Sequence, residues 1–410
     1  MYSDRPVWGT RWSVVLGGFM LALMGGLSYS WGVFVKPLGD ILGWSKSSAM
    51  VPLSVFMMVF ALVMIPAGRL QERFNTRRLI VTGACLFLLS NLLSSFVLVF
   101  ASRIWLVFTY GIIGGIACGL TYSCVAPAIR WWFPDFPGLA VSLGVMGFGL
   151  ASFFFAPFKA NYSIPVLGLD GTFLLIAALT FIITMLASRL VVFPTEQSYI
   201  HLFGAMHLPD KTGMIRANIK PKQMVKRSLF WMVWSSFLFI IYGSLLIIGI
   251  LPAYGQEVAL LSGSKAAIPI SLFALFNGIS RPIVGFTSDK IGIPKVMMIV
   301  YAAQAIVFFL FPYYITDLLS MNIAAIILGF GIGSALALYP VLTSELFGVE
   351  HLGMNYGIVF TAYGFGAIAI QAGAYVRDVT GSYELPLLIA GVLSVISTVL
   401  VFMIQQKYKV

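Results

Sequence analysis

The sequence carries little charge for its length. Only 10% of its 410 residues are charged, whereas an ordinary soluble domain has about 25%. Hydrophobic residues make up 60% of the chain. A soluble fold has no interior large enough to bury that much apolar surface, so the composition excludes a soluble domain and favours an integral membrane protein.

Residues that bind metals or perform hydrolysis are scarce as well. The three cysteines fall inside apolar runs without metal-ligand spacing, and the three histidines fall between the runs: Cys85, Cys118, Cys124, His201, His207 and His351. The apolar runs contain no Ser/His/Asp, paired-carboxylate or metal-ligand constellation. We therefore expect no enzymatic activity, no metal and no cofactor.

Acidic residues are outnumbered by basic ones. The chain has 14 Asp and Glu against 25 Lys and Arg, a net charge of +11. In a soluble protein this excess would indicate a nucleic-acid partner, but here the basic residues lie in short segments between apolar runs, where they orient a membrane protein. We expect a lipid bilayer as the partner, and no nucleic acid.

Long apolar runs dominate what is present. About 20 apolar residues span the roughly 30 Å of a bilayer's hydrocarbon as a helix. The first run is longer than the core of a secretory signal and no cleavage pattern follows it, so we expect it to stay in the protein. We predict twelve transmembrane helices, at 12–35, 48–70, 78–100, 104–131, 138–159, 170–193, 228–255, 266–288, 295–315, 321–347, 354–376 and 385–404.

One connection is long and polar, from Pro194 to Arg227. It predicts an N-terminal six-helix bundle over 1–193, a cytoplasmic linker over 194–227 and a C-terminal six-helix bundle over 228–410. With the N-terminus in the cytoplasm, 18 of the 25 Lys and Arg fall on inner segments and six on outer ones, Lys159 among them, while Arg281 falls within a span. This bias predicts cytoplasmic termini, and the compact loops suggest a multi-pass protein of a bacterial inner (plasma) membrane.

The two halves share a short motif after their second helices. Gly68 is followed by an acid four residues on and then by basic residues, and Gly285 is followed in the same way at an offset of 217 residues. Two ordinary basic loops are one interpretation and duplication of a six-helix unit is the other. An acid beside an Arg and a helix end can form a contact in one conformation and break it in another. We assign this gating role to Glu72, Arg73, Arg77, Asp289 and Lys290.

This motif resembles the signature loop of the major facilitator superfamily, although Asn75 stands where the first loop of that signature has its second glycine. The resemblance implies an all-α membrane protein with the major facilitator fold, twelve helices in two pseudo-symmetric six-helix bundles.

Arg281 is the one charged residue clearly inside an apolar run. An Arg at membrane depth costs about 2.5 to 3.5 kcal/mol on insertion scales, and no acid lies at that depth to neutralise it. One interpretation is a structural Arg bonded to carbonyls that Pro282 leaves free. The other is a bidentate clamp for a carboxylate that arrives with the substrate.

Polar residues are expected at the depth of Arg281. Tyr122, Tyr339 and Tyr363 are each about eight or nine residues, roughly 12 to 14 Å, from the inner ends of their helices. Asn277 lies one turn from Arg281 on the same helix face. Each tyrosine is equally compatible with packing, as are Ser28, Tyr29 and Ser30 on the first helix.

The predicted site is asymmetric, because the offset of 217 residues places Met64 where the first half would carry a second Arg281. A single cation suits a monocarboxylate better than a dicarboxylate, whose second charge would stay unpaired.

Three segments sharpen the resemblance to a smaller family. Asn277 to Lys290, Arg130 to Ala140 and Asn355 to Gly357 look like the monocarboxylate transporters and the neighbouring oxalate/formate antiporters. This resemblance implies that Arg281 binds the substrate carboxylate. It also implies that Asn277 replaces an Asp of animal monocarboxylate transporters, and that Tyr363 stands where oxalate carriers have a second cation.

The resemblance to lactate carriers implies proton cotransport, but no protonatable group accompanies Arg281. Glu257, near the outer end of the seventh helix, is the proton-coupling candidate, with an ordinary solvated carboxylate as the alternative. We therefore expect a secondary transporter of small monocarboxylates of the L-lactate or pyruvate type, a proton symporter that works by alternating access. An oxalate/formate-type anion exchanger and an exporter of amphipathic drugs, the latter motivated by 15% aromatic residues, remain alternatives.

Overall fold

The computed structural model describes residues 7–73, 75–194 and 218–408. The basic residues Arg5, Lys211 and Arg216, the histidines His201 and His207, and the side chains of Glu72 and Arg73 lie outside this description. The described residues form helices and connecting turns, with no strand among them.

The N-terminal half begins with a span that is interrupted. Helix α1 gives way to a short 3-10 segment, η1, before α2, and the fourth span changes from α-helix to a π-helical stretch, η2, and back. The helices of this half are α1 (Val7–Gly26), η1 (Leu27–Ser30), α2 (Gly32–Leu42), α3 (Lys46–Arg73), α4 (Thr76–Ser94), α5 (Val97–Phe100), α6 (Arg103–Leu106), η2 (Val107–Gly114), α7 (Gly115–Tyr122), α8 (Val125–Trp132), α9 (Pro137–Phe158), η3 (Lys159–Ser163) and α10 (Ile164–Ala187).

The C-terminal half has longer uninterrupted helices. They are α12 (Pro221–Met224), α13 (Ser228–Glu257), α14 (Gly263–Ile291), α15 (Ile293–Tyr314), α16 (Leu318–Phe347), α17 (Leu352–Gly366), α18 (Ile368–Thr380) and α19 (Glu384–Tyr408).

Eleven stretches of the described chain are long and apolar enough to cross a membrane. One of them, 137–187, is 51 residues long and holds two of the predicted spans. The chain turns within it at Gly168, whose φ of 73° lies in a region that glycine adopts without steric cost. Eleven stretches therefore correspond to the twelve predicted spans.

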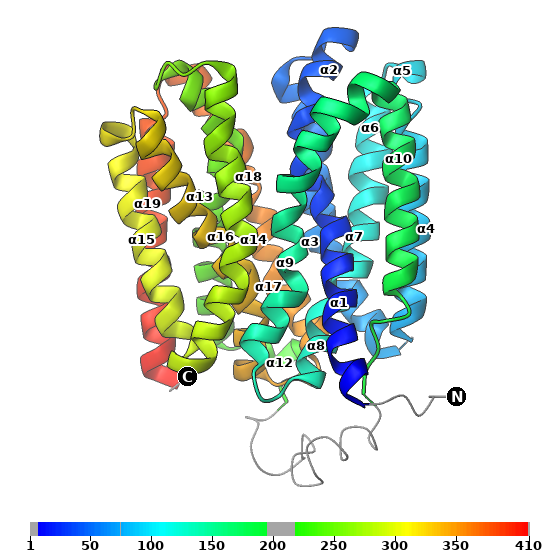
Figure 1. The fold of residues 1–410 in the computed structure, drawn as a ribbon. Coiled ribbons are helices and arrows are strands. Elements are labelled where there is room, and N and C mark those ends of the chain that lie inside the picture. The colour runs from blue at the N-terminus through cyan, green and yellow to red at the C-terminus, as the bar shows by residue number, and fades with distance from the viewer. Residues whose placement is uncertain (1–6, 74, 195–217, 409–410) are drawn as a thin grey trace.

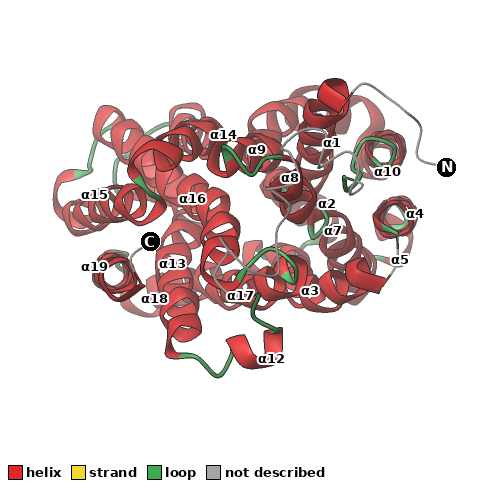
Figure 2. Ribbon diagram, turned by 90° about the horizontal axis from the view of Figure 1, so that it is seen from below, coloured by secondary structure: helices red, strands yellow, loops and turns green. Residues whose placement is uncertain are grey.

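The helices form two groups that lie side by side (Figure 1). Helix α1 begins, and α19 ends, at the end of the molecule where α12 lies, which we call the α12 end. Seen from that end, the groups meet where α9 packs against α14 and α3 packs against α17 (Figure 2).

Glycine allows the two halves to approach closely. A Cβ added at Gly149 would lie 2.6 Å from the backbone nitrogen of Gly278, and one added at Gly357 would lie 2.5 Å from the carbonyl oxygen of Met64. Real Cβ atoms do not approach other atoms this closely. The contact between halves therefore depends on bare backbone along both helix pairs.

Candidate functional site

Arg281 lies in the middle of α14 and is fully buried. Its Nε donates to the carbonyl of Asn277 at 3.2 Å, and its Nη2 donates to the side-chain oxygen of Asn277 at 3.0 Å. Its Nη1 donates to the carbonyl of Val145 on α9 at 2.6 Å. The guanidinium therefore joins the two halves through an oxygen of the opposite bundle.

No carboxylate of the described residues lies within ion-pair distance of Arg281, whose hydrogen bonds go only to neutral oxygens. Nor do these bonds go to the carbonyl of Gly278, which Pro282 leaves without its helical donor. A guanidinium has five N–H groups, and these three bonds leave capacity for a further acceptor. The predicted neighbour Asn277 is in place and orients the guanidinium.

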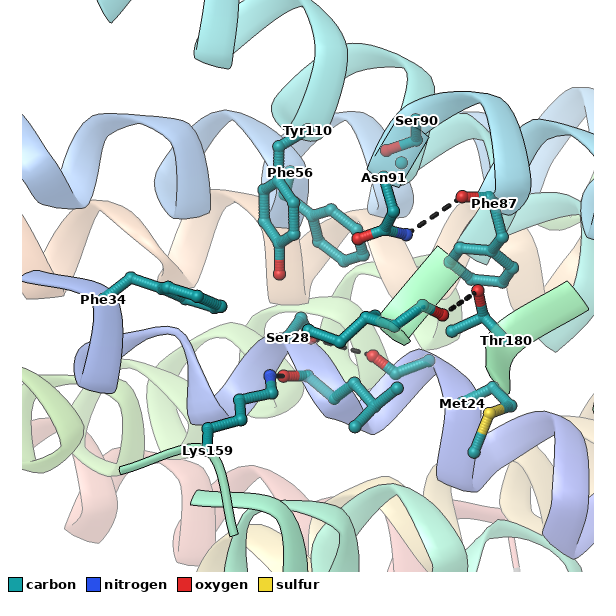
Figure 3. Close-up of a pocket in the computed structure, with 14 residues that line it drawn as sticks. Met24, Ser28, Phe34, Phe56, Phe87, Ser90, Asn91, Tyr110, Lys159 and Thr180 are labelled. Atoms are coloured by element: carbon teal, nitrogen blue, oxygen red, sulfur yellow. Dashed lines mark hydrogen bonds between the residues drawn. The ribbon is translucent and has the colours of Figure 1, made fainter. Parts of the chain in front are cut away.

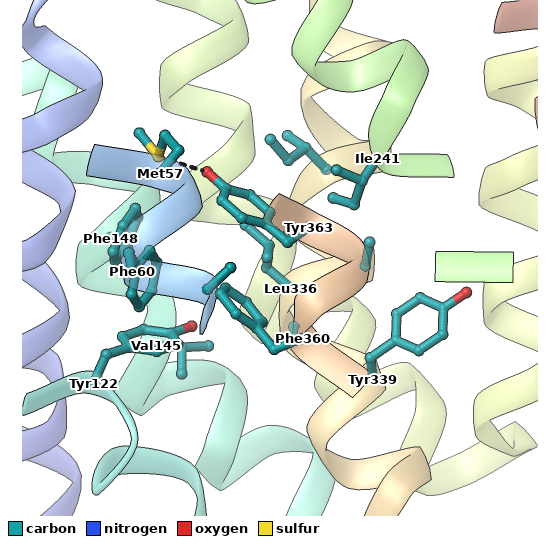
Figure 4. Close-up of a cluster of buried hydrophobic side chains, with 14 of the residues drawn as sticks. Met57, Phe60, Tyr122, Val145, Phe148, Ile241, Leu336, Tyr339, Phe360 and Tyr363 are labelled. Atoms are coloured by element: carbon teal, nitrogen blue, oxygen red, sulfur yellow. Dashed lines mark hydrogen bonds between the residues drawn. The ribbon is translucent and has the colours of Figure 1, made fainter. Parts of the chain in front are cut away.

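A cluster of phenol and phenyl rings lies beside Val145, whose carbonyl accepts the hydrogen bond from Arg281 (Figure 4). The Tyr122 ring packs edge-on against Phe60 and Phe148, with centroids 5.5 and 5.4 Å apart, and its hydroxyl interacts electrostatically with Arg281. Tyr363 stacks on Phe360 with centroids 5.0 Å apart. The structure thus brings Tyr122 and Arg281 together, as the sequence predicts.

A tyrosine pair connects the halves beside this cluster. The hydroxyls of Tyr29, on η1, and Tyr363, on α17, are 2.8 Å apart, and the Tyr363 hydroxyl is 3.2 Å from the sulfur of Met57. Arg281 interacts electrostatically with Tyr29. Tyr29 therefore faces the boundary between the halves, an orientation that the sequence left open.

Tyr339 is directed elsewhere. Its hydroxyl lies 2.6 Å from the Oγ of Ser236, and its ring stacks on Phe237, so the side chain serves the interior of the C-terminal half (Figure 4). The structure does not bring it to Arg281.

Tyr356 also belongs to this site, although the sequence did not mark it as a site residue. It is buried, its hydroxyl has no hydrogen-bond partner in the described part of the chain, and it interacts electrostatically with Arg281. Its only signal in the sequence was its position in the Asn355 to Gly357 run.

Asp289 closes the α12 end of the α9–α14 contact. Its two carboxylate oxygens accept hydrogen bonds from the backbone N–H groups of Gly138 and Leu139, each at 2.8 Å. These N–H groups belong to the first turn of α9, where a helix attracts negative charge. We call this contact between halves the Asp289 latch.

The other predicted gating residues are placed differently. Arg77 is exposed, and its backbone N–H is capped by the side chain of Asn75. The ammonium of Lys290 lies 4.1 Å from the centre of the Phe286 ring on its own helix. Arg130, which we had not assigned to gating, interacts electrostatically with Asp289 and donates from Nε to the Oγ of Ser344 across the halves at 3.1 Å.

Comparison with known proteins agrees with this architecture. The sequence pattern of the Major Facilitator Superfamily matches residues 14–371, and a second match covers residues 270–409. The chain belongs to the Major Facilitator Superfamily.

Relatives and solved structures extend this result. The chain is 27% identical over 357 residues to the oxalate:formate antiporter of Oxalobacter formigenes, covering 86% of this chain and 82% of that protein. It is 24% identical over 398 residues to monocarboxylate transporter 13 of Bos taurus, covering 95% and 88%. A crystal structure of a double-tryptophan XylE mutant has a TM-score of 0.73 at 19% identity, covering 98% of this chain and 96% of that one. FucP in the outward conformation has a TM-score of 0.63 at 14% identity, covering 93% and 98%. The protein is therefore a transporter of the major facilitator type with an all-α, two-bundle fold.

Glu257 of this transporter lies at the end of α13, away from Arg281. Its carboxylate accepts hydrogen bonds from Arg377 and from Tyr383, all at 3.0 Å, and its side chain is 44% exposed. Burial, followed by the hydrogen bond to Glu257, raises the pKa of Tyr383 to about 12, so its phenol stays protonated. Glu257 is thus the acceptor of a partly exposed ion pair.

Lys159, which the sequence places at the outer end of a predicted span, is buried. Its side chain is only 3% exposed and lies inside the 137–187 stretch. The reason is local: α9 continues past Pro157 into the π-helical segment η3 (Lys159–Ser163), so the side chain of Lys159 points into the N-terminal half. There it donates to the Oγ of Ser30 at 2.7 Å and to the carbonyl of Leu27 at 3.4 Å.

Proposed function

We propose that this transporter carries small monocarboxylates of the L-lactate or pyruvate type by alternating access, with cotransport of a proton. The observation that carries the proposal is Arg281, a fully buried guanidinium that the described residues supply with neutral oxygens and no carboxylate. A substrate carboxylate would complete it, since Arg and carboxylate groups pair through two parallel hydrogen bonds.

The contacts of Arg281 suggest how binding is coupled to movement. Its Nη1 bond to Val145 crosses from α14 to α9. A carboxylate that binds the terminal nitrogens competes with the Val145 carbonyl for Nη1, and thereby weakens one of the contacts between the halves. Substrate binding and separation of the halves are linked in this way because both involve Nη1.

The surrounding side chains support discrimination among acids. The phenols of Tyr122, Tyr29 and Tyr356 offer hydroxyl groups beside the guanidinium, and Phe60 and Phe148 form apolar walls. A hydroxyl or keto group next to the carboxylate can bond to a phenol, while the walls limit chain length. Asn277 orients Arg281 from one turn away.

The experiment is uptake of labelled L-lactate into proteoliposomes. Arg281→Ala removes the clamp, and Arg281→Lys keeps the charge but loses the planar pair of donors. Both variants should lose nearly all saturable uptake. Arg103→Ala is the matched control, because it removes an exposed guanidinium whose hydrogen bond goes to the hydroxyl of Ser48. Undiminished uptake by the Arg281→Ala variant would refute the proposal.

A second candidate is an anion exchanger of the oxalate/formate type, favoured by the 27% identity to the Oxalobacter formigenes antiporter. Lys159 does not supply the second cation that a dicarboxylate needs at the Arg281 site. Val145 bonds to Arg281, and Lys159 is 14 residues further along the same helical stretch, roughly 21 Å away. An exchanger would take up labelled substrate only when an anion is present on the opposite side of the membrane, and a pH gradient would not change its uptake.

We further propose a plasma-membrane location with the α12 end in the cytoplasm. The sequence bias of Lys and Arg supports this orientation. Labelling of single cysteines at Ser47 and at Lys220 from either side of sealed cells tests the orientation.

A further inference from the structure

Lys159 and Arg281 share an unusual environment in separate parts of the molecule. Lys159 is 3% exposed, and no carboxylate of the described chain lies within ion-pair distance of it. Its ligands are the Ser30 hydroxyl, the Leu27 carbonyl and the face of the Phe34 ring, whose centre is 5.2 Å from the ammonium. Removing an ammonium from water without a counter-charge costs several kcal/mol. A residue that only packs at this position would not need a charge, so the cost indicates a functional role.

A small cavity lined by both apolar and polar side chains adjoins Lys159 (Figure 3). Its volume is about 20 Å³, room for one water molecule. Two buried polar atoms of its lining, the Oγ of Ser90 and the Oδ1 of Asn91, have no hydrogen-bond partner among the described residues. A lysine, two unpartnered acceptors and space for water together provide the parts of a proton-binding site.

The other titratable groups around this cavity are two phenols and one thiol. Tyr110 of η2 lines the cavity with Lys159. Tyr29 of η1 and Cys118 of α7 lie on neighbouring elements, and α4 and α10 contribute only Ser90, Asn91, Thr180 and apolar residues to the lining. The acid of α10, Asp170, is exposed. Lys159 is therefore the one basic residue that lines this cavity, and burial without a counter-charge favours the neutral form of a lysine.

The partners of Lys159 connect it to the Arg281 site. Leu27 and Ser30 are three residues apart in the 3-10 segment η1, so they lie one above the other on one face. Tyr29 points from another face of η1 to Tyr363 in the opposite half and interacts electrostatically with Arg281. Ser30 also donates its own proton to the Leu27 carbonyl at 2.6 Å. A change of charge on Lys159 therefore acts on the element that carries Tyr29.

We propose that Lys159 is the residue that binds the cotransported proton, in place of Glu257, and that η1 couples its charge to the carboxylate site at Arg281. The inference rests on the proposed monocarboxylate transport. The neutral amine of Lys159 takes a proton from hydronium and leaves water, and the ammonium that forms bonds to Ser30 and Leu27. One proton then enters for each carboxylate, so the charge of the substrate is balanced.

The test separates exchange from accumulation in proteoliposomes. Lactate–lactate exchange at equal pH on both sides needs the Arg281 site alone. When the interior is two pH units more alkaline than the outside, one-to-one coupling accumulates lactate about 100-fold. The accumulation in protein-free liposomes is subtracted as background. Lys159→Met should retain exchange within about twofold and lose the accumulation. Lys36→Met, which removes an exposed lysine of α2, should lose neither.

Each result is decisive for one claim. If the wild-type protein shows no exchange of any monocarboxylate, the proposed function itself fails. If exchange is present but the Lys159→Met variant still accumulates lactate like the wild type, or the wild type ignores the gradient, Lys159 is not the proton carrier. Lys159→Arg, which stays charged, guards against a folding defect: it should also exchange without accumulating, and full accumulation by it would overturn the inference.

Discussion

The Asp289 latch gives a prediction whose size follows from its geometry. Each carboxylate oxygen accepts one N–H of the first turn of α9 at 2.8 Å, as an N-cap residue does. Loss of such a cap costs about 1 kcal/mol, and loss of a negative charge at an exposed helix N-terminus costs about 0.3 to 1 kcal/mol. Asp289→Ala removes both contributions, roughly 1.3 to 2 kcal/mol.

This free energy is lost only from the conformation in which the α12 end is closed, because the latch joins the two halves. Every 1.4 kcal/mol is a factor of ten in the equilibrium. Asp289→Ala should therefore raise the population open at the α12 end roughly 10- to 30-fold. Asparagine caps helices nearly as well as aspartate, so Asp289→Asn loses mainly the charge and should raise that population by about 2- to 5-fold.

The assay is alkylation of a cysteine placed inside the closed contact. Ser142 on α9 is fully buried and faces Gly285 of α14, so Ser142→Cys, in a background without the three native cysteines, reports opening through its maleimide labelling rate. The control is Asp317→Ala, because Asp317 caps α16 with N–H bonds inside its own half. Equal labelling rates with and without the Asp289 side chain would refute the reasoning.

Four further predictions concern the contact between halves, the tyrosines and the Glu257–Arg377 ion pair. Gly149→Val places a side chain against the backbone of Gly278 and should abolish uptake while leaving membrane insertion intact, as compared by uptake and by the amount of purified protein. Tyr29→Phe should raise the KM for lactate several-fold because the cross-half hydroxyl bond is lost. Tyr339→Phe should leave KM unchanged and lower the thermal midpoint, since a buried hydrogen bond is worth about 1 kcal/mol; the reverse pattern would contradict both assignments. Glu257→Gln should keep the pH-driven accumulation of lactate. If this variant loses the accumulation, Glu257 is the proton-coupling residue.

Composition and hydrophobic run length were enough to predict the spanning helices. A run of about 20 apolar residues has few alternatives to a spanning helix in a bilayer, and Gly168, at a positive φ, divides the one stretch that exceeds the length of a span. Local spacing also predicted the pair Asn277 and Arg281, because residues four apart meet on a helix whatever surrounds it.

The sequence did not predict the rotation of each helix about its own axis. Tyr339 and Tyr122 lie at similar predicted depths, yet one turns into its own bundle and the other toward Arg281. Depth follows from counting residues along a helix, whereas the direction of a side chain depends on how neighbouring helices pack.

By itself, the sequence determined the membrane class, the number of spans, the Arg281–Asn277 pair and the motif of Asp289, because each depends on composition or on spacing within one helix. Only the tertiary structure decided that Lys159 is buried, that Tyr29 meets Tyr363 and that Asp289 caps α9. These features join segments far apart in the chain, and such contacts are set by packing between helices.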